Sequence, residues 1–115
     1  MALIFRVSSI PTLGRLPGGF SDHTAHFAAY AVLGALLLRA LADGRWAGVT
    51  RRRAVFAWGL SVVYGVTDEF HQWFVPGRFA ALDDLVADAL GAAAAIALAG
   101  AAAALVERRH ARREV

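Results

Sequence analysis

The feature that most constrains this chain is an apolar run near its C-terminus that contains no charged residue. It covers the 18 residues from Ala89 to Val106. At about 1.5 Å per helical residue, such a run is long enough to cross the hydrocarbon core of a membrane. Composition agrees, because 58% of the 115 residues are hydrophobic and only 18% are charged. Soluble domains usually have about a quarter charged residues, so the chain is neither disordered nor an ordinary soluble domain.

Two further apolar segments reach spanning length if they include polar residues at one end. The turns Asp43-Gly44 and Pro76-Gly77 separate the three segments. We therefore predict one domain with an all-α fold, a polytopic transmembrane helical bundle of three clear spanning helices at 24–42, 54–74 and 82–106. Residues 1–20 start apolar but contain Arg6 and two prolines, which predicts an interfacial segment or a truncated helix.

Charge predicts how these helices are oriented. All 12 basic residues are arginines, and two groups of them, at 45–53 and 108–113, border the apolar runs. The positive-inside rule then places the loop 43–53 and the basic tail 107–115 in the cytoplasm. Arginines without interleaved aromatic residues argue against a nucleic-acid partner. The absence of cysteine excludes disulfides and thiolate metal sites.

With this topology, the unusual polar residues all fall at the outer end of the bundle. They are Asp22, His23, His26, Asp68, Glu69, His71, Gln72, Arg78, Asp83, Asp84 and Asp88. Spacings of four residues put Asp22 with His26, Asp68 with Gln72, and Asp84 with Asp88 on shared helix faces. An ionised carboxylate at membrane depth costs about 3 kcal/mol or more, so such groups face a cavity or one another. We expect a polar pocket that opens to the outer leaflet.

Some of these residues have simpler interpretations. Asp22, Asp83 and Asp84 stand where helices begin and are suited to capping them. Arg78 suits nonspecific contact with lipid phosphates. Capping does not account for Asp68 and Glu69, which lie near a C-terminal helix end where the dipole disfavours them. It also fails for His26 and Asp88, which lie one turn inside their helices.

The polar motifs resemble those of the VanZ-like family of small bacterial membrane proteins. The segment 22–34 is similar to the family's Asp-Lys-x-x-His-Phe motif with a following Tyr and Leu-Gly pair. The segment 68–78 resembles its Asp-Glu-x-x-Gln and Pro-Gly-Arg signature. Three positions depart from the family pattern: His23 replaces a lysine, Ala81 a serine and Asp88 an asparagine. The resemblance implies a multi-pass protein of the bacterial cytoplasmic (inner) membrane and a link to teicoplanin, a glycopeptide antibiotic that targets the cell envelope.

Three functions remain open on the sequence. The first is binding of a phosphate-bearing phospholipid or lipid-linked cell-wall precursor; its candidate ligand-binding residues are Asp22, His71, Gln72, Arg78, Asp84 and Asp88. The second is phosphoester hydrolysis or transfer with a divalent metal, in which Asp68, Glu69 and His26 are the candidate catalytic residues. The third is a structural cluster in which Arg78 and the carboxylates neutralise one another. Because three helices bury only a shallow pocket, a homo-oligomer is a further expectation.

Overall fold

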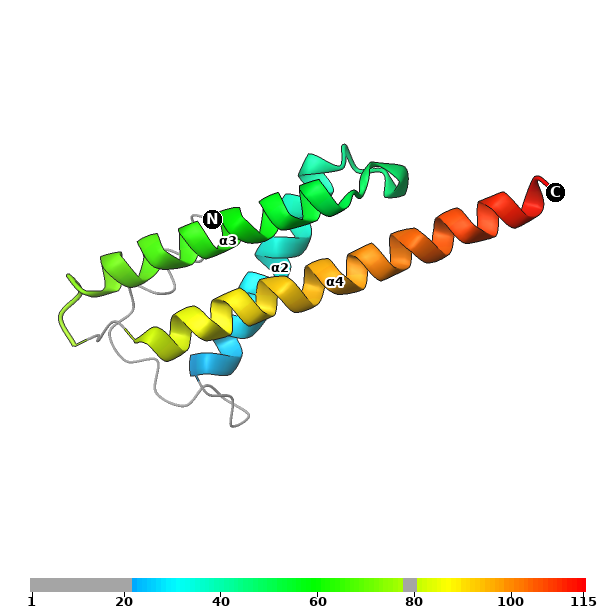
Figure 1. Ribbon diagram of the computed structural model, residues 1–115. Helices are drawn as coiled ribbons and strands as arrows, with labels where there is room; N and C mark the ends of the chain where they lie inside the picture. Colours follow the sequence, from blue (N-terminus) through cyan, green and yellow to red (C-terminus); the bar gives the residue numbers. More distant parts are fainter. Residues whose placement is uncertain (1–21, 78–80) are drawn as a thin grey trace.

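The computed structural model describes residues 22–77 and 81–115, which are helical apart from short connections. The helices are α2 (Asp22–Leu41), α3 (Arg51–Gln72) and α4 (Leu82–Arg113), with a 3-10 helix, η1, at Trp46–Gly48. Figure 1 shows α3 and α4 running side by side in opposite directions, with α2 crossing behind them. The predicted all-α fold is confirmed over the described residues, which contain no strand. The predicted segment 1–20 lies outside them.

Local sequence accounts for the connection between α2 and α3. Asp43 and Gly44 have φ angles of 54° and 69°, a left-handed conformation that ends α2. The Gly44 amide donates a hydrogen bond to the Arg39 carbonyl at 2.9 Å. The α3 helix begins after Thr50, whose hydroxyl accepts a hydrogen bond from the Arg53 amide at 3.2 Å. These residues turn the chain by short-range bonds alone, which is why the sequence predicts this connection.

The bundle buries polar as well as apolar residues, and its outer faces carry large apolar side chains. Among the described residues, six polar or charged side chains are buried, namely Ser61, Asp68, Glu69, Gln72, Asp84 and Asp88. Large apolar side chains are exposed on all three helices, including Val32 at 60%, Val63 at 63% and Leu98 at 72%. Buried carboxylates beneath apolar outer faces suit a protein whose solvent is lipid. The structure is therefore compatible with a helical membrane protein.

Two of the three helices qualify as membrane spans by length and hydropathy, namely His23–Leu41 of α2 and all of α4. The prediction of three clear spans is therefore wrong for α3. Three arginines open this helix, and Asp68, Glu69, His71 and Gln72 close it. The polar residues at both ends lower its hydropathy below that of its neighbours.

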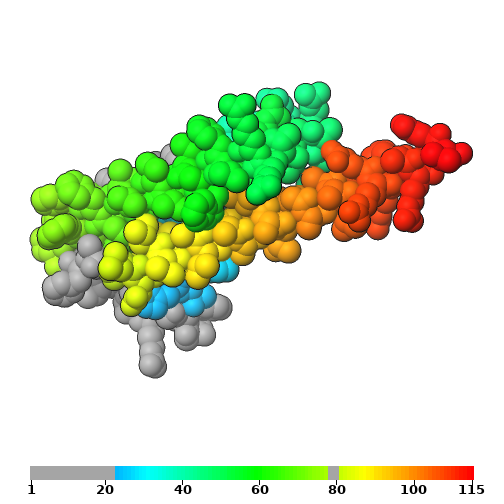
Figure 2. Space-filling view, viewed as in Figure 1, coloured from blue at the N-terminus to red at the C-terminus, as the bar shows by residue number. Residues whose placement is uncertain are grey.

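The α4 helix is longer than expected. Its 32 residues extend through Arg113, so most of the basic segment 107–115 is helical. At about 1.5 Å per residue the helix is about 48 Å long, against about 30 Å for a hydrocarbon core. Figure 2 shows its last turns projecting beyond α3.

Close packing of α2 on α4 depends on Gly91. A Cβ atom built at this position would overlap the backbone carbonyl of Phe27 on α2. A second glycine, Gly34, lies against Ala92. A Cβ atom built at Gly34 would lie 3.0 Å from the Ala92 Cα. Small residues let the two backbones approach this closely. The approach brings the polar ends of α2 and α4 together.

Candidate functional site

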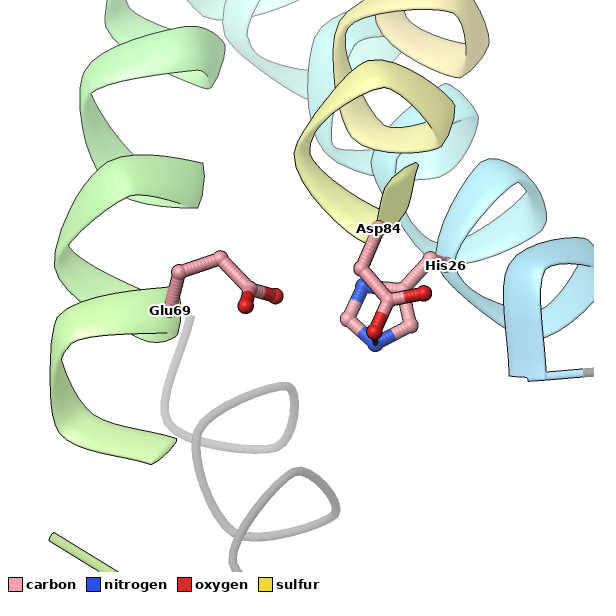
Figure 3. A group of neighbouring side chains, drawn as sticks. All are labelled: His26, Glu69 and Asp84. Carbon is pink, nitrogen blue, oxygen red and sulfur yellow. Dashed lines mark ion pairs between the residues drawn. The ribbon is translucent and has the colours of Figure 1, made fainter. Parts of the chain in front are cut away.

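The N-terminal ends of α2 and α4 and the C-terminal end of α3 meet at one end of the bundle. Side chains from all three helices converge there, as Figure 3 shows for His26, Glu69 and Asp84. One ligand-type atom from each of these residues lies within 4.8 Å of those from the other two. The convergence that the sequence predicts for the three polar helix ends is thus present in the structure.

His26 joins α2 to α4. Its Nδ1 atom lies 2.8 Å from Asp88 Oδ1, and its Nε2 atom lies 3.9 Å from Asp84 Oδ2. The Asp88 side chain is fully buried and that of His26 is 10% exposed, so water screens this pair little. Both nitrogens of the ring therefore face carboxylates of the same helix face.

Glu69 reaches the cluster from α3. Its Oε2 atom accepts a hydrogen bond from the Ala81 amide at 2.9 Å. Its Oε1 atom is buried and has no hydrogen-bond partner among the described residues. In Figure 3 the carboxylate points from α3 toward Asp84 and His26. A buried carboxylate oxygen without a partner is costly, so this atom is suited to an additional ligand.

A layer of aromatic rings lies beside the cluster. The Tyr30 ring stacks on His26 with centroids 6.5 Å apart and lies 6.2 Å from the Tyr64 ring. Tyr30 is fully buried, and its hydroxyl has no partner among the described residues.

Asp68 is 1% exposed and accepts a long hydrogen bond of 3.5 Å from Gln72 Nε2. Asp68 and Gln72 thus share a face, as their spacing predicts.

The structure gives Asp84 a different role from helix capping. The N-cap of α4 is Ala81, which makes no side-chain cap bond. Asp84 instead pairs with His23, with 2.7 Å between Asp84 Oδ1 and His23 Nδ1. Its neighbour Asp83 is exposed. Asp84 therefore belongs to the cluster, while Asp83 does not.

The remaining predicted residues are placed as follows. His71 is half-buried in the last turn of α3. Arg78 and the side chain of Asp22 lie outside the described part of the structure. The roles assigned to all these residues remain predictions.

Sequence reasoning missed two contributors to the site. His23 is 57% exposed, and the sequence assigns it no binding or catalytic role, yet its Nδ1 atom lies 2.7 Å from Asp84 Oδ1. Its spacing of three residues from His26 was the available signal. Gly65 makes room for Asp88, because a Cβ atom there would lie 3.1 Å from Asp88 Oδ2. It lies three residues before Asp68, on the same helix face.

Buried carboxylates at the end of an apolar-faced helical bundle are compatible with one class of protein, the helical membrane proteins with a polar site at one end. A model of the family described as VanZ/LLP1 matches residues 5–103 of the chain. The chain belongs to this family, which confirms the resemblance of its motifs. No curated protein and no solved structure matches it.

Proposed function

We propose that this protein is a multi-pass protein of the bacterial cytoplasmic membrane that binds a phosphate-bearing envelope lipid or lipid-linked cell-wall precursor. The loop 43–53 and the basic end of α4 would lie in the cytoplasm, because arginines border both. The polar cluster would then lie at the outer face, where wall precursors are used. A link to glycopeptide resistance would follow from binding such a precursor.

One observation carries this proposal: buried polar groups lie at the end of helices whose outer faces are apolar. A lipid with a charged head group has the matching distribution of polarity. A shallow surface hollow of about 600 Å³ adjoins the cluster, and its lining includes the apolar side chains of Phe27, Val86 and Leu90. Such a hollow suits the start of a hydrocarbon chain.

The charge of the cluster requires a cation in addition. The described site holds Asp68, Glu69, Asp84 and Asp88, and these carboxylates repel phosphate. In the sequence, Arg78 follows α3 closely and supplies one positive charge suited to phosphate. Lipid binding therefore needs Arg78, a metal ion or both.

A second function is favoured by the convergence of His26, Glu69 and Asp84. A metal held there would polarise a phosphoester and activate water, which is the chemistry of a phosphoester hydrolase or transferase. In that case Asp68, which is not among these three residues, would act as the base. A purely structural cluster is the third interpretation, in which buried pairs fix the helix packing.

Native mass spectrometry of the detergent-purified protein distinguishes the three. We expect wild type to carry a phosphate-bearing lipid, and Arg78→Ala and Glu69→Gln to lose it. Glu107→Gln, which neutralises an exposed carboxylate at the far end of α4, is the matched control and should retain it. Conversion of a phosphoester by wild type alone would favour the enzyme. If wild type and variants all carry no lipid and differ only in yield, the structural cluster is the interpretation that remains.

A further inference from the structure

We propose that His26, Glu69 and Asp84 bind one divalent transition-metal ion, with Asp88 as the residue that positions His26. This inference rests on the proposed function for its setting and deepens it, because it names the cation through which phosphate is held. The three ligands come from three helices, so the ion would also tie the polar end of the bundle together.

The spacing of the ligand atoms suits a metal. Ligands about 2.1 Å from an ion on opposite sides of it are about 4.2 Å apart. His26 Nε2 and Asp84 Oδ2 already lie within this limit, at 3.9 Å. One possible ligand atom from each of the three residues lies within 4.8 Å of those from the other two. Three ligands placed evenly around an ion with bonds of this length lie about 3.4–3.6 Å apart, so the set closes by movements of roughly an ångström, mainly of the Glu69 side chain.

Each ligand is held through its other polar atom. Asp88 binds Nδ1 of His26 at 2.8 Å and leaves Nε2 for the metal. This is the carboxylate–histidine–metal arrangement that fixes the ring and its tautomer. His23 binds Oδ1 of Asp84, and the Ala81 amide binds Oε2 of Glu69. One atom of each ligand then remains for the metal: Nε2 of His26, Oδ2 of Asp84 and Oε1 of Glu69.

Burial and charge point to the same conclusion. Glu69 is 8% exposed, and its Oε1 atom has no hydrogen-bond partner in the described residues. Asp84 is also 8% exposed. Two carboxylates with a neutral imidazole carry two negative charges, which a divalent ion neutralises. Without the ion, these charges would be left facing one another in a poorly solvated site, at high cost.

The ligand set selects the kind of ion. An imidazole with two carboxylates suits Mn²⁺ or Zn²⁺, whereas Ca²⁺ prefers six to eight oxygens and copper(I) prefers sulfur. Three protein ligands leave at least one coordination position for water or a phosphate oxygen. The metal would therefore offset two of the cluster's negative charges and offer a phosphate oxygen an open coordination position.

The test is calorimetric titration of the full chain, in detergent and stripped with a chelator, with Zn²⁺ and with Mn²⁺. We expect one ion per chain, bound at least tenfold more weakly by Glu69→Gln and Asp84→Asn. Glu107→Gln is the matched control, because it removes one carboxylate charge from an exposed position at the far end of α4 and should bind as wild type does. Helical content measured by circular dichroism checks that each variant is folded.

The positioning role of Asp88 has its own variants. Asp88→Leu should weaken metal binding by about 10- to 100-fold, as loss of a group that orients a histidine ligand does. Asp88→Asn keeps an acceptor oxygen for His26 and should recover most of this loss. Thermal unfolding in chelator gives the metal-independent effect of each variant. Equal metal affinity in Asp88→Leu and wild type would refute the positioning role.

The metal site is overturned if wild type binds neither ion, or if Glu107→Gln and Asp84→Asn weaken binding equally. Native mass spectrometry separates its failure from that of the proposed function. Lipid retained without any metal would refute the site and leave lipid binding standing. Metal bound with the expected variant pattern, but no lipid under any condition, would refute lipid binding and leave the site standing.

Discussion

Substitution of Gly91 by alanine tests the packing that assembles the site. The added Cβ would overlap the Phe27 carbonyl on α2, inside the distance of about 3.3–3.6 Å at which carbon and carbonyl oxygen meet. A backbone carbonyl cannot turn away as a side chain can, so α2 and α4 must separate. Overpacking of this kind costs about 1–3 kcal/mol.

Gly100→Ala is the control for this variant. It lies in the same helix, and a Cβ there would meet no atom within 4 Å. Both substitutions gain the same helix propensity, about 1 kcal/mol, so the difference between them isolates the contact with Phe27. We expect Gly91→Ala to be less stable than Gly100→Ala by about 2 kcal/mol, or about 30-fold in the unfolding equilibrium.

Unfolding in SDS, followed by circular dichroism, measures this difference. Equal unfolding free energies for the two alanine variants would refute the close approach of α2 and α4. An unfolding difference without any change in metal affinity would show that the site does not depend on this contact. We expect both to change, because Phe27 follows His26 directly.

Two further predictions concern orientation and the site. The chain has no cysteine, so Ala47→Cys and Pro76→Cys each provide a single site for labelling. A membrane-impermeant maleimide should modify Pro76→Cys on intact cells and Ala47→Cys only after lysis. The reverse pattern would show that the topology is inverted. Gly65→Ala should weaken metal binding several-fold, because its Cβ would lie 3.1 Å from Asp88 Oδ2. Gly59→Ala, with no atom within 4 Å of its Cβ, should bind as wild type does, and equal losses in both would contradict this packing.

The helices and their ends could be predicted because short-range chemistry decides them. Asp43 and Gly44 end α2 through their own backbone conformation, and the uncharged run in α4 sets its apolar length. The same chemistry explains why α4 continues beyond its apolar run. Arginines after Val106 end the apolar pattern, yet they favour the C-terminal turns of a helix and do not stop it. Apolar length and helix length are therefore different quantities in this chain.

Pairing between helices could be predicted only in part. Spacings of four residues show that Asp84 and Asp88 share a face, but they do not show which groups on α2 meet that face. The partners are His23 and His26, three residues apart, and only the tertiary structure pairs them. The sequence therefore does not show that His23 contacts Asp84.

The two histidine–aspartate pairs and the Gly91 contact form one interface. Both α2 and α4 begin at the polar end of the bundle, so contacts advance along both in the same direction: His23 meets Asp84, His26 meets Asp88, and Phe27 meets Gly91. A change of register between the helices would break all three together. Gly91 carries no charge, yet it fixes the separation at which His26 reaches Asp88. The geometry of the proposed metal site thus depends on a position that no ligand pattern would identify, and the Gly91→Ala variant tests packing and site at once.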